Sequence, residues 1–398
     1  MMERIKTLVL DSNGAGWKNV FLDTVLRGFL RSDVDESLLP NRLRKFHRLQ
    51  WLLGQQRYEA QSYLLDWRDA LEQAPQLDTE SCNINNLVEY NRHRPAIEQY
   101  PLIIILHTAT GDDMSLLLKT VHWFEKRRGK LVVFIGNEYD LMGEKFSFLR
   151  ATGADFVCSQ LPIKTASWLY AECLPTQVLA LPHALNPNIY HPDANIKRNI
   201  DIGFVGAEYP YFLGDIERNT MVRYIQEHCT DFGLSCDINL GTHYKMPRKE
   251  WMVYLNTCKG ITGAEAGSPY LDRRGQIIGL AKAYVKIHPN ATFEELYKRF
   301  FRTPDVPYIS GKCISSRHFE PVGTKTCMVL LEGSYNDVLK PDEHYISVNK
   351  GFTNIEDVIR RFKNKAYRST MVNHTYEYIM DEHTYKHRVK TLIKAVIG

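Results

Sequence analysis

The feature that most constrains the fold is a repeated alternation of short apolar runs with helical segments. Apolar runs at residues 5–10, 101–106 and 131–135 each end in a polar turn. The pattern restarts at 201–206 and includes the run Cys327–Leu331, which lies between glycines. Short apolar runs that alternate with helices indicate buried parallel strands, because parallel strands need a long crossover between them. The sequence therefore predicts an α/β protein built on parallel sheets.

A polar, proline-flanked segment at Asp193–Asn199 divides this alternation into two series. An alternating β/α series on each side of a hinge predicts two doubly wound domains. The chain of 398 residues, 44% of them hydrophobic, has enough material for two cores. We place an N-terminal domain at 1–193, a C-terminal domain at 194–370 and a closing helical segment at 371–398.

Charge and cysteine content narrow the class of protein. The formal net charge of +4 is mildly basic, which suits anionic ligands or a membrane surface and is too weak to imply nucleic acid. The eight cysteines contain no Cys-x-x-Cys pair, so we expect reduced thiols, without a zinc site or a disulfide framework. No apolar stretch approaches the ~18 residues of a membrane span, and we expect a cytoplasmic protein.

Polar side chains follow two of the strands predicted in the first half. His107 comes directly after the run 101–106, Asp112 lies in the same turn, and Glu138 follows the run 131–135. Ligands of open parallel sheets bind at the carboxyl ends of the strands. His107, Asp112 and Glu138 are therefore candidates for catalysis, the two carboxylates as general bases. The alternative for His107 is a histidine bonded within its own loop.

The second half offers a glycine and several charged side chains. Gly206 ends the first strand predicted there, where either a bound diphosphate or a plain tight turn would need glycine. An unperiodic loop at 263–275 holds Arg273 and lies either near a ligand or in a solvent-exposed insertion. Arg317 and Glu320 stand just ahead of the last buried strand and should face the mouth of the sheet.

The segment Arg317–Gly333 also carries a resemblance to a known family. Phe319-Glu320, a helical turn of small residues, an apolar strand and a further glutamate resemble the C-terminal half of GT-B glycosyltransferases. The likeness is to the family-four and CgeB-like group, the glycosyl transferases group 1. Leu339–Tyr345 resembles the group's Pro-Gly-Glu-His turn, and His383–Val389 resembles its closing helix.

The resemblance implies a GT-B fold, with two Rossmann-like domains that face a cleft and a C-terminal helix that crosses back to the first domain. It also implies a glycosyltransferase that moves a sugar from a nucleotide-diphosphate-sugar to a hydroxyl on a glycan, a lipid-linked acceptor or a small molecule. We expect no metal, no cofactor and no nucleic-acid partner. Retention of the anomeric configuration is implied as well. Inversion stays open, because Lys312 stands where the group has its sugar-contacting glutamate.

The same resemblance suggests roles in the donor site. Glu320 would hold the ribose of the donor, and His107 would contact the transferred sugar. Without a metal, charge on the leaving diphosphate must be stabilised by cations and helix N-termini, and we assign Arg317 and Lys325 to this task. The other predicted donor-binding residues are Gly206, Arg273, Gly323 and Thr324.

Two other functions remain open. A non-catalytic GT-B-like scaffold would bind a donor without turnover, and a nucleotide-sugar epimerase of similar fold would release nucleotide without transferring sugar. A basic run within residues 30–75 is either a solvated helix face or a patch that contacts the inner face of a membrane or an anionic acceptor. This run comprises Arg42, Arg44, Lys45, His47, Arg48 and Arg57.

Two short motifs near the N-terminus carry little weight. Asp33 and Asp35 match the metal-binding Asp-x-Asp of the other glycosyltransferase fold, but they follow a helix and not a strand. The turn with Gly14 and Gly16 lacks the third glycine of a dinucleotide fingerprint, since Asn19 stands in its place. We interpret it as an acceptor-side turn.

Overall fold

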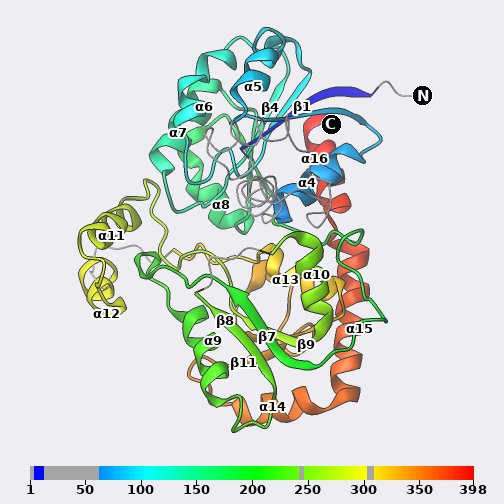
Figure 1. The fold of residues 1–398 in the computed structure, drawn as a ribbon. Coiled ribbons are helices and arrows are strands. Elements are labelled where there is room, and N and C mark those ends of the chain that lie inside the picture. Colours follow the sequence, from blue (N-terminus) through cyan, green and yellow to red (C-terminus); the bar gives the residue numbers. More distant parts are fainter. Residues whose placement is uncertain (1–3, 13–61, 242–245, 303–308) are drawn as a thin grey trace, which may run out of the picture.

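Two parallel β-sheets form the centres of two domains in the computed structural model, which describes residues 4–12, 62–241, 246–302 and 309–398 (Figure 1). The first sheet has the strand order β2-β1-β3-β4-β5-β6, and the second has the order β11-β10-β9-β7-β8. Neighbouring strands pair in parallel throughout these two sheets. The predicted α/β architecture of two doubly wound domains is confirmed.

The first sheet is buried on both faces. Leu8 and Leu10 of β1 enter one apolar core and Val9 enters the other, because successive side chains of a strand point to opposite faces. The strands are β1 (Ile5–Asp11), β2 (Leu77–Asn83), β3 (Leu102–Ile105), β4 (Lys130–Phe134), β5 (Phe156–Ser159) and β6 (Gln177–Ala180). The helices are α4 (Ser62–Glu72), α5 (Leu87–His93), α6 (Ser115–Lys119), α7 (Met142–Thr152) and α8 (Ile163–Leu169).

The second sheet follows the same rule. In its interior strand β10, Met328 and Leu330 enter one core while Val329 and Leu331 enter the other. The strands are β7 (Ile200–Gly206), β8 (Cys236–Leu240), β9 (Cys258–Gly263), β10 (Cys327–Leu331) and β11 (Ile346–Val348). The helices are α9 (Glu217–His228), α10 (Arg248–Thr257), α11 (Gln276–Ile287), α12 (Phe293–Leu296), α13 (Ser316–Gly323), α14 (Ile355–Lys363), α15 (Lys365–Glu382) and α16 (Tyr385–Ile397).

The C-terminal helices join the two domains. α15 packs on the second domain, where Met371 belongs to its core, and α16 packs beside α4 on the first (Figure 1). Between them the backbone N–H of Leu185 donates to the His383 carbonyl and that of Tyr385 donates to the Leu185 carbonyl, each at 3.0 Å. The predicted crossing back is confirmed. It occurs at His383, so the helical residues from 371 up to that point still belong to the second domain.

One prediction about the cysteines is wrong. Cys229 and Cys236 form a disulfide, whereas the other six cysteines are free and buried as expected. Cys229 follows the last residue of α9 and Cys236 opens β8, so a short turn brings them together. Gly233 makes this turn possible, because its φ of +58° is costly for other residues.

Some expectations concern parts of the chain outside the described residues. The Gly14 turn, the Asp33–Asp35 pair and the basic run from Arg42 to Arg57 all belong there. Among the described helices, none combines the length and apolar character that a bilayer crossing requires. The cytoplasmic location and the peripheral membrane contact stay predictions.

The predicted loop 263–275 lies between the domains. After the end of β9 it has no regular element, and Leu271 from this loop enters a core of the first domain. Beyond it, Lys282 of α11 lies 2.5 Å from the Asp140 carboxylate, which follows β4. The loop and α11 therefore bridge the two domains rather than forming a solvated insertion (Figure 1).

Candidate functional site

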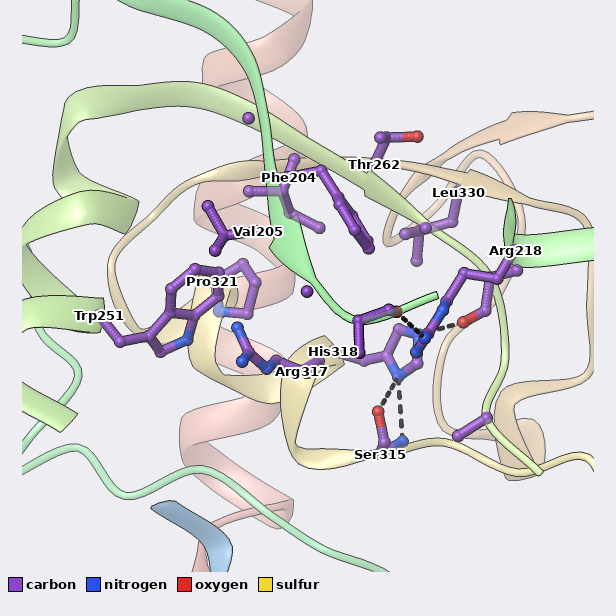
Figure 2. A pocket seen from close by; sticks show the side chains of 17 residues that line it. Phe204, Val205, Arg218, Trp251, Thr262, Ser315, Arg317, His318, Pro321 and Leu330 are labelled. Atoms are coloured by element: carbon purple, nitrogen blue, oxygen red, sulfur yellow. Dashed lines mark hydrogen bonds between the residues drawn. The ribbon is translucent and has the colours of Figure 1, made fainter. Parts of the chain in front are cut away.

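A cavity of about 260 Å³ lies at the carboxyl ends of β7 and β9 (Figure 2). Its walls are the strand ends Gly203–Ala207 and Ile261–Ala264 with side chains from α9, α10 and α13. β7 has β8 on one side and β9 on the other, so the chain leaves β7 toward one neighbour and returns to the other. At such a switch point the connecting helices leave a crevice in which ligands of open parallel sheets bind. The topology places the candidate site here.

Arg218, from α9, brings a half-buried guanidinium to this cavity. Its Nη2 donates to the Ala207 carbonyl at 2.8 Å, and its Cζ lies 3.6 Å from the ring centroid of Tyr209. Within the described part of the chain, no carboxylate forms an ion pair with it inside 4.0 Å. Burial lowers the pKa of Arg218 below its ordinary value, because the charged group loses hydration. An anionic ligand would supply the missing counter-charge.

Arg317 and Trp251 form a second wall. The Arg317 Cζ lies 4.0 Å from the ring centroid of Trp251, close enough for a cation–π contact. The Trp251 Nε1–H donates to Glu320 Oε2 at 2.7 Å, and the Arg317 Nε lies 3.9 Å from the same oxygen. Of the predicted donor-binding residues, Gly206 and Arg317 line the cavity, whereas Glu320 does not. Glu320 is buried behind Trp251 and fixes both neighbours.

The amino-terminal end of α13 also faces the cavity (Figure 2). The backbone N–H of Ser315 donates to His318 Nδ1 at 3.0 Å, so the neutral ring carries its proton on Nε2, which lies 3.2 Å from the Ala264 carbonyl. Burial lowers the pKa of His318 to about 4, so the ring stays neutral and fixes the start of the helix. The free N–H groups of a first helical turn favour an anion. In the same wall, the buried Thr262 hydroxyl has no hydrogen-bond partner among the described residues.

Three predicted donor residues lie at the other end of α13. The Lys325 Nζ donates to Asn373 of α15 at 2.9 Å, and Thr324 is fully buried. A Cβ on Gly323 would come within 2.5 Å of the Tyr190 carbonyl, so this glycine permits close packing against the hinge. α13 is eight residues, or ~12 Å, long, and its residues Arg317, His318 and Pro321 line the cavity whereas its last residues do not. The structure does not bring Gly323, Thr324 or Lys325 to the site.

Lys312, which replaces the glutamate of the resembling group, is paired within the second domain. Its Nζ lies 2.5 Å from Asp215 Oδ2 and 3.3 Å from Glu217 Oε2. Glu265 does not substitute for the missing carboxylate, because its Oε1 accepts from the backbone N–H of Tyr335 at 2.7 Å. None of these three acidic groups lines the cavity.

Arg273 also lies away from the cavity. Its Cζ is 5.0 Å from the ring centroid of Trp168, a residue of the first domain, so it contributes to the contact between domains. Asp272 beside it accepts from the backbone N–H groups of Gln276 and Ile277 at 2.9 Å and caps α11. These contacts account for the charged residues of the loop without a role for them in binding a sugar donor.

Two of the predicted catalytic residues of the first domain, His107 and Asp112, lie close together in the chain. His107 is buried next to His183, with 5.0 Å between ring centroids, and neither of its ring nitrogens has a partner among the described residues. Burial, and then His183, lower the pKa of His107 well below its ordinary value, so the ring is neutral. Asp112 is exposed and accepts from the Asn137 amide. Both lie beyond the carboxyl end of β3, and neither lines the cavity of the second domain.

Glu138 is not available as a general base. Its carboxylate accepts from the Ser159 hydroxyl at 2.6 Å, from the Tyr170 hydroxyl at 2.7 Å and from the backbone N–H of Gln160 at 2.9 Å. Burial raises its pKa, although these three donors favour the ionised form. Glu138 therefore holds the ends of β4 and β5 together, and the prediction of a catalytic role is corrected.

A larger cavity, of about 660 Å³, lies at the hinge and is lined by residues of α4, α16 and the segment 185–188. Its two carboxylates, Asp66 and Asp69, are bonded to Arg248 at 2.8 and 2.6 Å. Both carboxylates already pair with Arg248, and we place the donor site instead in the cavity at β7 and β9, which lies at the switch point of the second sheet.

Sequence reasoning missed part of the site. In the sequence, Arg218 lies on the helix that follows the predicted strand 201–206, which ends at Gly206. This position is the one signal that could have identified Arg218 as a site residue. Trp251 and Thr262 carry no such signal, because each comes from a separate strand or helix that only the folded sheet brings close.

Part of the cavity lining lies in a region of the chain that matches a known protein family. Residues 250–394 match a family model described as glycosyl transferase-like, a region that includes Trp251 and Arg317. No curated protein matches the sequence. The family model does not distinguish the CgeB-like group, so that finer assignment stays a prediction.

Several solved structures resemble the whole chain. An alpha-glucosyltransferase in complex with UDP and a 13-mer DNA containing a HMU base has a TM-score of 0.55 and 10% identity, covering 100% of both chains. A second structure, of an alpha-glucosyltransferase in complex with UDP and a 13-mer DNA containing a central A:G mismatch, has a TM-score of 0.53 and 9% identity, covering 99% of this chain and 100% of that one. The T4 phage beta-glucosyltransferase has a TM-score of 0.51 and 10% identity, covering 98% of this chain and 99% of that one.

These likenesses establish the fold, which is GT-B, with a 6-stranded and a 5-stranded parallel sheet and a C-terminal helix that crosses back. The fold and the family match together support an enzyme of the glycosyltransferase class.

Proposed function

We propose, from the GT-B fold and the glycosyl transferase-like match, that this chain transfers a sugar from a nucleotide-diphosphate-sugar to a hydroxyl acceptor. One observation carries the proposal. Arg218 places a cation without a described carboxylate partner in the switch-point cavity, beside Arg317 and the start of α13. A diphosphate is the anion that two guanidinium groups and a helix N-terminus suit best.

The proposed chemistry follows from this charge arrangement. The bond between the anomeric carbon and the terminal phosphate oxygen breaks, and the nucleotide diphosphate leaves with the bonding electrons. Arg218, Arg317 and the first turn of α13 stabilise the charge that develops there, which lowers the barrier more than it strengthens ground-state binding. Phe204 offers a flat apolar face to the nucleoside.

The first domain would hold the acceptor across the cleft. We assign His107 to the transferred sugar and Asp112 to the acceptor hydroxyl, because both follow the carboxyl end of β3. The resemblance to family-four enzymes favours retention of the anomeric configuration. If Asp112 instead took the acceptor proton during attack from the opposite face, the product would be inverted.

The acceptor class includes one more candidate than the sequence suggested. Two of the similar structures hold DNA with the enzyme, so the expectation that nucleic acid is excluded is not confirmed. DNA that carries a hydroxymethylated base therefore joins glycans and lipid-linked hydroxyls as a proposed acceptor.

Incubation of the purified chain with a panel of UDP-, GDP- and TDP-sugars tests the proposal. We expect transfer from one donor class to at least one acceptor, and retained configuration in the anomeric coupling of the product's proton NMR spectrum. Nucleotide release without a transferred sugar would favour an epimerase. Donor binding without turnover, across the whole acceptor panel, would favour a scaffold.

We expect donor turnover to survive a chelator. The proposed phosphate contacts are two arginines and helix N–H groups, and none of the described residues that line the cavity has a carboxylate to hold a magnesium or manganese ion. Initial rates with and without EDTA should agree within about twofold. Loss of turnover that manganese restores would show that the diphosphate is stabilised by a metal.

The change Glu320→Ala should weaken donor binding by about 1.5 to 3 kcal/mol, the range for a hydrogen bond to a charged group. The loss would act through Trp251 and Arg317, which the Glu320 carboxylate holds at 2.7 and 3.9 Å. Calorimetric titration with the donor measures it. Glu320→Gln keeps an acceptor for Trp251 and should recover part of the affinity, whereas unchanged affinity in Glu320→Ala would exclude this positioning role.

A further inference from the structure

A second group of chemically reactive side chains lies in the first domain, far from the cavity. Cys82 is near the end of the edge strand β2, and Glu89 and His93 lie on α5. One ligand atom from each of the three lies within 4.8 Å of the other two. Residues four apart on a helix share one face, so α5 presents both side chains to Cys82 together. Figure 1 shows α5 at the end of the first domain remote from the second sheet.

We propose that Cys82, Glu89 and His93 bind one divalent transition-metal ion, of which zinc is the best match, with water in the fourth position. Thiolate, imidazole and carboxylate are the ligands of zinc and cobalt, whereas magnesium and calcium prefer oxygen alone. Zn–S and Zn–N bonds are about 2.3 and 2.0 Å long. The three ligand atoms, which lie within 4.8 Å of one another, would have to move closer together when the ion binds.

The hydrogen bonds around His93 support this assignment. The Tyr100 hydroxyl donates to Glu80 Oε2 at 2.5 Å and lies 3.4 Å from His93 Nδ1. Since that hydroxyl proton is already directed to Glu80, the phenol oxygen can only accept, and Nδ1 carries the proton of the neutral ring. The lone pair is then on Nε2. A histidine whose other N–H meets an acceptor or a carboxylate is the usual arrangement behind a metal ligand.

The charge around Cys82 also favours a cation. Its side chain is 1% exposed, and the carboxylates of Glu89, Asp11 and Glu80 act on it electrostatically. A bound divalent ion would offset these negative charges and would hold the sulfur as a thiolate. The gain would be structural, because the ion would tie α5 to the edge strand β2.

The described residues contain a second cluster of this kind, and it lacks the same support. Glu343, His344 and His374 also lie within 4.8 Å of one another. The backbone N–H of Lys340, however, donates to His344 Nδ1 at 3.0 Å, so the neutral ring carries its proton on Nε2. That nitrogen, 3.6 Å from Glu343, could bind a metal only after losing the proton. The two clusters therefore make a matched comparison.

Cobalt titration of the metal-stripped full chain tests the proposal. We expect a near-ultraviolet thiolate-to-cobalt band that saturates at one equivalent and is removed by zinc. The band should be absent in Cys82→Ser, and His93→Gln should weaken binding at least tenfold. Cys173→Ser, another buried thiol of the first domain, and His374→Asn, from the second cluster, are controls that should keep the band.

No band at one equivalent, a band that survives Cys82→Ser, or a band lost in His374→Asn would overturn the proposal. If Cys82→Ser does not fold, Glu89→Gln decides, because Glu89 is only partly buried. Affinity at least tenfold weaker in that variant supports the site, and unchanged affinity overturns it. The readout is spectroscopic and independent of glycosyl transfer, so it stands or falls separately from the proposed function.

Discussion

Replacing Arg218 with alanine should lower turnover by about two to three orders of magnitude, the usual effect of removing one fixed group that stabilises transition-state charge. In free energy this is about 3 to 4 kcal/mol. Arg218 is expected to cause the larger loss of the two cavity arginines, because it is half-buried and held by the Ala207 carbonyl, whereas the Arg317 side chain is 50% exposed. Donor affinity should fall as well, measured by calorimetry, with turnover measured at saturating donor.

Two further variants make this result specific. Arg218→Lys keeps the charge but loses the planar fork, so turnover should recover only in part. Arg223→Ala removes a cation from the same helix, where it pairs with Glu208 at the surface, and should leave turnover within about twofold of the parent. Equal effects of Arg218→Ala and Arg223→Ala would mean that the cavity does not hold the diphosphate.

Replacing Arg248 with alanine should lower the free energy of unfolding by about 2 to 3 kcal/mol, somewhat below the range for a fully buried ion pair because Arg248 is 18% exposed. Its guanidinium reaches from α10 to Asp66 and Asp69 on α4, and Asn186 of the hinge donates to Asp66 at 2.8 Å. The variant leaves Asp66 buried without its cation and loosens the contact between domains. Denaturant unfolding measures the change.

The loss of unfolding free energy in Arg248→Ala should depend on pH, because the buried Asp66 carboxyl titrates. Burial raises its pKa from 3.8 to about 7, although Arg248 and Asn186 favour the ionised form. A folded-state pKa above the unfolded value adds stability that is complete below about pH 4 and is lost as the pH rises through about 7. A protonated Asp66 can stay buried without a cation, so Arg248→Ala should cost less at pH 5.5 than at pH 8.

Asp66→Asn and Lys249→Ala complete the test. Asp66→Asn removes the titrating group, so stability should depend less on pH between about 4 and 7. Combined with Arg248→Ala, it should restore part of the lost stability, because no buried charge remains. Lys249→Ala removes an exposed neighbouring cation and should change stability by less than about 0.5 kcal/mol. A loss in Lys249→Ala as large as in Arg248→Ala would point to general charge effects.

The strands were predictable because their signal is local. The runs 131–135 and Cys327–Leu331 were located from apolar residues between turns, and the structure places β4 at Lys130–Phe134 and β10 at Cys327–Leu331. A strand buried on both faces must be apolar at nearly every position, and this property is written in a few consecutive residues. The same holds for the two doubly wound domains, since alternating strands and helices leave few other ways to bury the sheets.

The members of the site were decided by the tertiary structure. Arg317 and Lys325 are close in sequence, yet only Arg317 reaches the cavity, because α13 carries the chain away from it between them. Arg218 and Trp251 come from other helices and meet Arg317 through the order of the strands. Local patterns record which side chains are buried. Which of the charged ones converge depends on contacts between distant segments, and only the folded chain contains those contacts.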